Sequence, residues 1–207
     1  MRKNLKRIFT VALAVLTVMV LVSCQSISKP VNTADGKFAG KTVILHSNDV
    51  HGAIAKYTYM AGLKEYFQNE GATVLTVDDG DFSQGSVYVS SSKGANAVTV
   101  MNAVGYDIAG LGNHEFDYGS EVLKNNLANA TFKVICANIY ENGKPLFDPY
   151  AIYKVGNMKI AFFGMLTPQT MTKVNPGLIR TLQFPEHEEF FAIAKKTAAK
   201  LSKSADI

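Results

Sequence analysis

Short apolar, β-branched runs alternate along this chain with longer segments in which apolar residues recur at helical spacing. The apolar runs predict strands at Thr42–Leu45, Thr73–Val77, Ile108–Leu111 and Phe132–Ala137. The intervening segments predict helices near Ala55–Gln68, Ala95–Val104 and Ser120–Ala128. This alternation is typical of βαβ units, so the pattern predicts an α/β fold that contains a parallel sheet.

The second half of the chain has a different pattern. Two alternating runs, Tyr150–Val155 and Met158–Gly164, flank the turn pair Gly156-Asn157 and predict an antiparallel hairpin. A helix is expected to begin near Pro185, with acidic residues early and lysines late, as the helix dipole favours. The last residues, Ser204–Ile207, resemble the start of a further strand, and we expect the reading frame to be truncated there.

The first 23 residues predict a targeting signal. A basic start precedes the apolar run Ile8–Val22, whose 15 residues would span about 22 Å as a helix, short of the ~30 Å hydrocarbon core. Residues 1–23 therefore indicate a signal peptide. The run ends in Leu21-Val22-Ser23-Cys24, which resembles the bacterial lipobox, in which the cysteine is acylated. We expect Cys24 to anchor an extracytoplasmic protein to the bacterial cell envelope; the alternatives are an ordinary secretory signal or a core cysteine.

Residues 24–40 are polar and rich in turn formers, and we expect them to be a flexible tether before a catalytic domain at 41–207. The composition, 47% apolar and 18% charged, is that of a globular protein. The net charge of +4 comes from four basic residues in the signal peptide, so the basic and acidic residues of the rest of the chain are equal in number. This balance argues against a nucleic-acid polymer as partner. Cys136 lies in an apolar run and is expected to be a core residue, so no disulfide framework is available.

Three polar motifs follow three of the predicted strands. They are Ser47–Gly52 (SNDVHG), Asp79–Gly85 (DGDFSQG) and Gly112–Gly119 (GNHEFDYG). Because the carboxyl ends of parallel strands meet at one edge of a sheet, we expect the three motifs to converge there.

The residue types in these motifs suit a pair of divalent cations. Carboxylate, imidazole and amide groups bind Zn²⁺, Mn²⁺ or similar ions, and two such ions lying close together need a bridging carboxylate. Asp81 is the candidate bridge, Asp49 and His51 are candidate ligands of the first ion, and Asn113 is the candidate ligand of the second.

The third motif also contains a candidate catalytic pair. His114 directly follows a candidate ligand and can face a substrate pocket, where it would donate a proton or hydrogen bond to a phosphoryl oxygen or leaving group. Asp117, three residues on, can hold the imidazole and favour its charged form. We expect Glu115 and Phe116 to have structural roles.

The three motifs together resemble the metallophosphoesterase superfamily, and the extended forms Leu45–Gly52 and Gly112–Gly119 resemble its secreted 5′-nucleotidase branch. The resemblance covers about residues 41–207. It implies a four-layer α/β/β/α catalytic domain that hydrolyses nucleotide phosphate esters at a dinuclear centre. Carried over by position, the resemblance implies that the metal ligands are Asp49, His51, Asp81 and Asn113. It implies that His114 and Asp117 form the catalytic dyad.

The chain also departs from this family. Members supply further histidines from later strands and a carboxy-terminal substrate domain, which the 207 residues do not contain. His46 is expected to be a satisfied core group and His187 an inert residue at a helix start. The alternative function is a non-catalytic surface lipoprotein, or an inactive fragment, that keeps the scaffold for binding.

Overall fold

The computed structural model describes residues 26–207. The predicted signal peptide and Cys24 lie outside the described residues. Within the described part, no helix is both long enough and apolar enough to cross a bilayer.

The first sheet is formed by four parallel strands in chain order. They are β2 (Thr42–Ser47), β3 (Thr73–Asp78), β4 (Ile108–Ala109) and β5 (Lys133–Val134). All six residues of β3 are buried, as expected for a central strand covered on both faces. The parallel sheet predicted from the alternating pattern is therefore confirmed, although β4 and β5 are shorter than the predicted runs.

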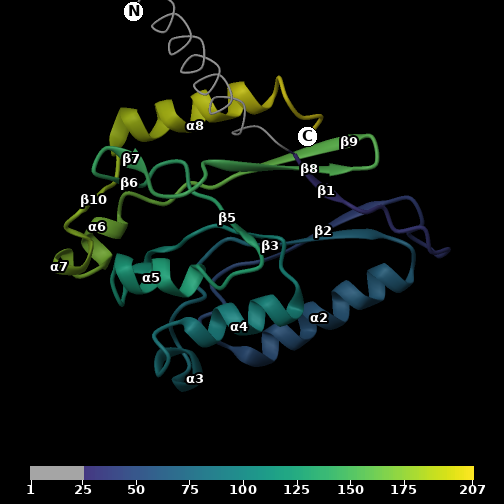
Figure 1. Cartoon of the computed structure of the whole chain (residues 1–207), viewed down its shortest axis with the longest axis horizontal. Coiled ribbons are helices and arrows are strands. Elements are labelled where there is room, and N and C mark those ends of the chain that lie inside the picture. Colours follow the sequence, from purple (N-terminus) through teal and green to yellow (C-terminus); the bar gives the residue numbers. More distant parts are fainter. Residues whose placement is uncertain (1–25) are drawn as a thin grey trace, which may run out of the picture.

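Helices follow the strands of this sheet and cover one of its faces (Figure 1). They are α2 (Ile54–Asn69), α3 (Val87–Ser90), α4 (Ala95–Val104), the 3₁₀ helix η2 (Asn113–Phe116) and α5 (Ser120–Leu127). A core on this side joins α2 and α4 to the sheet through Tyr57, Met101 and Ala109, each 1% exposed or less. Burial of these apolar side chains fixes the helices against the strands.

The second sheet has the order β1-β8-β9. Its strands are β1 (Ile27–Lys29), β8 (Tyr150–Val155) and β9 (Met158–Phe163). The pair β8–β9 is the predicted hairpin, with Tyr150 opposite Phe163. A small third sheet, in the order β10-β6-β7, comprises β6 (Tyr140–Glu141), β7 (Lys144–Pro145) and β10 (Leu182–Gln183).

The two larger sheets pack face to face. Leu75, Val77 and Ile108 of the first sheet contact Tyr153 and Ile160 of the second in one buried cluster. On the outer side of the second sheet lies α8 (His187–Leu201), so helix, sheet, sheet and helices follow one another in Figure 1. The α/β class and the layered α/β/β/α arrangement expected from the resemblance are thus confirmed. Two short helices, α6 (Thr170–Lys173) and α7 (Pro176–Ile179), complete the fold.

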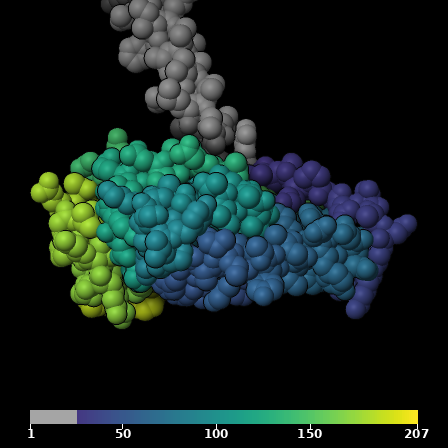
Figure 2. All heavy atoms as spheres, turned by 90° about the horizontal axis from the view of Figure 1, so that it is seen from below, coloured from purple at the N-terminus to yellow at the C-terminus, as the bar shows by residue number. Residues whose placement is uncertain are grey.

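Residues 26–40 differ from the expected flexible tether. Strand β1 pairs in parallel with β8, with Ile27 opposite Tyr153. Phe38 lies edge-on against the ring of Phe67, with ring centroids 5.0 Å apart, and Figure 2 shows the segment, in purple, against the blue surface that includes α2. The prediction of a tether without regular structure was wrong here, because three residues in a polar context give too short a pattern to indicate a strand.

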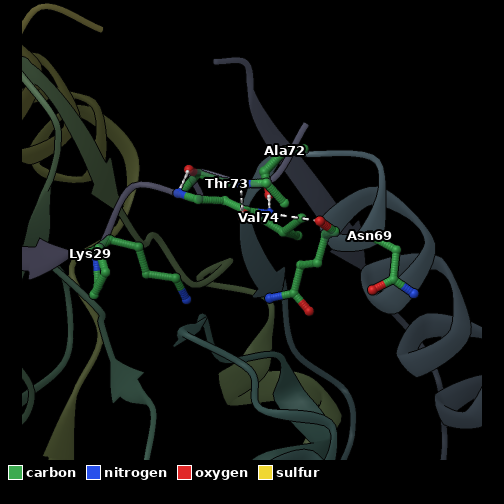
Figure 3. A pocket seen from close by; sticks show the side chains of 9 residues that line it. Lys29, Asn69, Ala72, Thr73 and Val74 are labelled. Carbon is green, nitrogen blue, oxygen red and sulfur yellow. Dashed lines mark hydrogen bonds between the residues drawn. The ribbon is translucent and has the colours of Figure 1, made fainter. Parts of the chain in front are cut away.

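The same segment lines a cavity of about 410 Å³ (Figure 3). The side-chain amide of Asn32 donates there to the backbone oxygens of Gln68 and Ala72, and its backbone N–H donates to Thr73 Oγ1. Lys29 forms an ion pair with Asp107. The cavity lies at the amino end of β3, so it is remote from the edge where the three motifs follow their strands.

The last two residues, Asp206 and Ile207, hydrogen-bond to the outer edge of β9. The N–H of Ala161 donates to the carbonyl oxygen of Ile207 over 2.8 Å, and the N–H of Ile207 donates to the oxygen of Lys159 over 3.3 Å. These two hydrogen bonds have the pattern of a parallel ladder beside β9. Only Asp206 and Ile207 pair with β9 in this way, because the N–H groups of Ser204 and Ala205 donate to Leu201 O at the end of α8. The strand predicted for Ser204–Ile207 is therefore not formed over its first two residues.

Candidate metal centre

The three motif loops meet at the carboxyl edge of the first sheet, as their positions after β2, β3 and β4 predict. Backbone hydrogen bonds join the first two loops: the N–H of Asp49 donates to Gly80 O over 3.1 Å, and that of His51 to Asp81 O over 3.0 Å. The third loop joins the second, because the N–H of His114 donates to Asp81 Oδ1 over 2.9 Å. Asp81 is thus the residue at which all three loops are connected.

Three of the candidate ligands have a left-handed backbone. Asp49, His51 and Asp81 have φ values of 50°, 48° and 61°. This region is unfavourable for residues with a side chain and persists only where surrounding contacts impose it. Strain of this kind collects at functional sites. Three of the six described non-glycine residues with positive φ are candidate ligands, and the other three, Lys93, Asn142 and His187, lie outside the candidate site.

Three potential ligand atoms form a compact group. His51, Asp81 and His114 each offer one atom, and these atoms lie within 4.8 Å of one another. Asp49 adjoins the group, with its Oδ1 3.5 Å from His51 Nε2. Its pKa is lowered, chiefly because the side-chain amide of Asn48 donates to its carboxylate. Asp49 is therefore ionised at neutral pH and available to a cation.

His114 and Asp117 are in direct contact. Nδ1 of His114 lies 2.7 Å from Asp117 Oδ2, and both side chains are about 30% exposed. The contact fixes the imidazole with its Nε2 side away from Asp117. The ring of His114 also lies edge-on to that of His51, with centroids 5.1 Å apart.

Glu115 is buried next to the candidate metal group and connects two of its loops. Its side chain is 2% exposed, and its two carboxylate oxygens accept four backbone N–H groups at 2.6–3.0 Å. The donors belong to Asp81, Phe82, Ser83 and Gly112. Burial raises the pKa of Glu115 to about 7, while the four N–H donors favour the carboxylate. Glu115 therefore has the structural role expected from the sequence, and that role is to hold the second and third loops together.

A second buried carboxyl lies at the end of β3. Asp78 is fully buried and accepts hydrogen bonds from Ser47 Oγ over 2.6 Å and from the N–H of Gly80 over 2.9 Å. Burial raises its pKa to about 7. The buried Asp78 carboxylate therefore fixes the backbone at the start of the second loop through its hydrogen bond with Gly80.

The glycines of the motifs permit close packing of the loops. A Cβ on Gly80 would overlap the backbone of Gly112, and one on Gly112 would overlap the carboxylate of Asp81. At both positions the neighbouring loop occupies the space that a side chain would need. The loops can converge this closely only because these residues are glycine.

The remaining predicted residues have different outcomes. Asn113 begins η2 directly before His114, which places it at the same edge. The prediction that His46 is a satisfied core group was wrong: its side chain is 66% exposed and its Nδ1 lies 4.0 Å from Asp79 Oδ2, because the second sheet does not cover this part of β2. His187 is exposed at the start of α8, as expected.

One site residue was not selected from the sequence. The side-chain amide of Gln84 lies 3.1 Å from His51 Nδ1. The available signal was its position in the second motif, three residues after Asp81.

The chain is similar to bacterial 5′-nucleotidases. It is 32% identical to a 5′-nucleotidase of Vibrio parahaemolyticus over 94% of this chain, and 33% identical to the protein UshA of Escherichia coli over 84%. The chain belongs to the 5′-nucleotidase branch of the calcineurin-like phosphoesterases. No family model matches the chain.

Solved structures of this family have the same fold. A calcineurin-like phosphoesterase from Bacillus subtilis, YfkN, superposes with a TM-score of 0.66 at 26% identity, covering 79% of this chain and 59% of that one. A 5′-nucleotidase precursor from Thermus thermophilus gives a TM-score of 0.64 at 27% identity, covering 79% and 35%.

The chain spans about a third of the length of these curated relatives, 37% of the Vibrio protein and 33% of the Escherichia protein. The relatives named 5′-nucleotidase are hydrolases of the metallophosphoesterase type, a family that uses divalent metals. The donor set fits such ions, since His51, Asp81 and His114 present nitrogen and oxygen atoms within 4.8 Å in one partly exposed group.

Proposed function

We propose that the protein to which this chain belongs hydrolyses phosphate esters of nucleotides, with a pair of divalent cations at the edge formed by the three loops. The observation that supports this most directly is the convergence of the three loops, which brings one polar atom each of His51, Asp81 and His114 within 4.8 Å of one another and so places the proposed proton donor beside two proposed ligands. The names of the relatives support a nucleotide substrate. The candidate esters are 5′-nucleotides, 2′,3′-cyclic nucleotides and nucleotide sugars.

In this proposal Asp49 and His51 hold one cation, Asp81 bridges two, and Asn113 holds the second. The ions would be Zn²⁺, Mn²⁺ or similar, given the mixture of carboxylate, imidazole and amide. Bound metals would neutralise charge that develops on the phosphoryl group and lower the pKa of water. Asp81 suits the central position because its backbone and carboxylate already connect the other two loops.

His114 and Asp117 would act on the substrate. Nδ1 of the imidazole lies 2.7 Å from Asp117 Oδ2, so Asp117 holds the ring with Nε2 on the side away from it. From there His114 can hydrogen-bond to a phosphoryl oxygen or protonate a leaving oxygen. The dyad therefore supplies the proton that ester cleavage requires.

The direct test uses the full-length protein with adenosine 5′-monophosphate, a 2′,3′-cyclic nucleotide and a UDP-sugar. We expect phosphate or nucleotide release from at least one, loss of that release after chelation, and recovery on adding Mn²⁺. Release that survives complete removal of metal would contradict the proposal. Metal binding without cleavage of any ester would instead support the non-catalytic binding alternative.

Anchoring at Cys24 is a separate proposal. It is supported by the short apolar run and by Ser23 before the cysteine. In labelled cells, we expect a fatty-acid probe to tag the wild type and not Cys24→Ser, while Cys136→Ser should be labelled normally because that thiol is buried in the core. Equal labelling of the wild type and Cys24→Ser would contradict the proposal that Cys24 carries the lipid.

A further inference from the structure

The side chain of His51 is enclosed on one side by the segment that follows Asp81. The N–H of Ser86 donates to the carbonyl oxygen of His51 over 3.2 Å. A Cβ on Gly85 would overlap that same carbonyl, so the backbone passes directly behind the histidine. The residue before them, Gln84, places its amide nitrogen Nε2 3.1 Å from the ring nitrogen Nδ1.

The opposite side of the ring faces the candidate metal group. Nε2 lies 3.5 Å from Asp49 Oδ1, and the side chain is 36% exposed. The two nitrogens of His51 therefore have different neighbours: Nδ1 contacts the partly buried amide of Gln84, whereas Nε2 adjoins the carboxylate of Asp49.

We propose that Gln84 is a positioning residue that fixes the tautomer and the ring orientation of His51, so that Nε2 is the nitrogen presented to a cation. This inference rests on the proposed function and adds a residue to it. A neutral histidine binds a cation through one nitrogen only when the proton is on the other. The amide nitrogen of Gln84 faces Nδ1 in the structure, and a half-turn of the amide exchanges it for the oxygen. In that orientation an Nδ1–H group would donate to the amide oxygen, leaving Nε2 for a cation.

The backbone explains why such support is needed. His51 has a φ of 48°, so its conformation depends on contacts from outside its own loop. Ser86 and Gly85 fix its backbone, and Gln84 is the side chain that fixes its ring. Partners of this kind typically change metal affinity by about 10–100-fold when they are removed.

The experiment compares Gln84→Met, Gln84→Glu and the control Gln183→Met in the full-length protein. Met keeps the length and approximate volume of Gln but accepts no strong hydrogen bond, whereas Glu keeps an acceptor oxygen at the same place. Gln183 is exposed on β10. We expect Gln84→Met to weaken Mn²⁺ binding by about 10–100-fold, with binding by Gln84→Glu and Gln183→Met within about threefold of the wild type.

A second measurement separates positioning from a general loss of structure. Two-bond ¹H–¹⁵N spectra of the metal-free protein should show His51 with its proton on Nδ1 in the wild type and in Gln84→Glu. In Gln84→Met a mixture of the two tautomers is expected, together with an unchanged unfolding temperature. Equal Mn²⁺ affinity and an unchanged tautomer in Gln84→Met would overturn the inference. If the wild type binds no divalent cation, the proposed function fails instead.

Discussion

Replacing His114 by Ala in the full-length protein should lower nucleotide hydrolysis by about 10²–10⁴-fold while leaving bound metal largely in place. Nδ1 of the imidazole lies 2.7 Å from Asp117 Oδ2, so the ring is held with Nε2 on the side away from Asp117. Metal content measured on the purified variant, alongside its turnover, provides the test. His187→Ala is the matched control, because that histidine is 91% exposed at the start of α8.

Asp81→Ala should lower both the metal content and the rate of nucleotide hydrolysis. Asp81 accepts the N–H of His114, and its backbone connects to His51, so its carboxylate is central to the group. Asp35→Ala, at an exposed position of the N-terminal segment, should change neither. If His114→Ala instead lost its metals while remaining folded, His114 would be a ligand and the dyad assignment would be wrong.

Glu115→Gln should destabilise the protein by about 2–5 kcal/mol, since buried hydrogen bonds to a charged acceptor contribute about 1.5–3 kcal/mol each. The carboxylate accepts four backbone N–H groups. A glutamine has one acceptor oxygen, and its NH₂ group would point at donors that then lack a partner. Midpoints of urea unfolding at pH 8 measure the effect.

The control for this change is Glu188→Gln, in the exposed first turn of α8, which should stay within about 0.5 kcal/mol of the wild type. Glu115→Gln should also weaken Mn²⁺ binding, because Glu115 ties the loop of Asp81 to that of Gly112. Equal stability of the Glu115 variant and the control would mean that the four hydrogen bonds are not needed to hold the loops.

The sequence predicted those parts of the site that depend on strand order. Polar residues directly after apolar runs can only collect at one edge of a parallel sheet, so the order of the strands alone was enough to bring Asp49, Asp81 and His114 together. The hairpin at β8 and β9 was equally predictable, because its alternation and its Gly-Asn turn are local signals.

Features that depend on distant neighbours could not be predicted in this way. The four donors to Glu115 come from two loops, and nothing in the residues beside it indicates them. The exposure of His46 depends on how far the second sheet extends over β2. Gln84 has a role only because its loop returns to His51, a contact between residues 33 positions apart.

The pairing of β1 with β8 also has a consequence for how the chain folds. Ile27 lies opposite Tyr153, 126 positions later, so the two strands can pair only after a long loop has closed. Contacts this far apart in sequence slow folding, because a large loop must close before they form. We therefore expect β1 to dock late, onto a β8–β9 hairpin that has already formed, and the unpaired edge of β8 to be the most aggregation-prone surface until then.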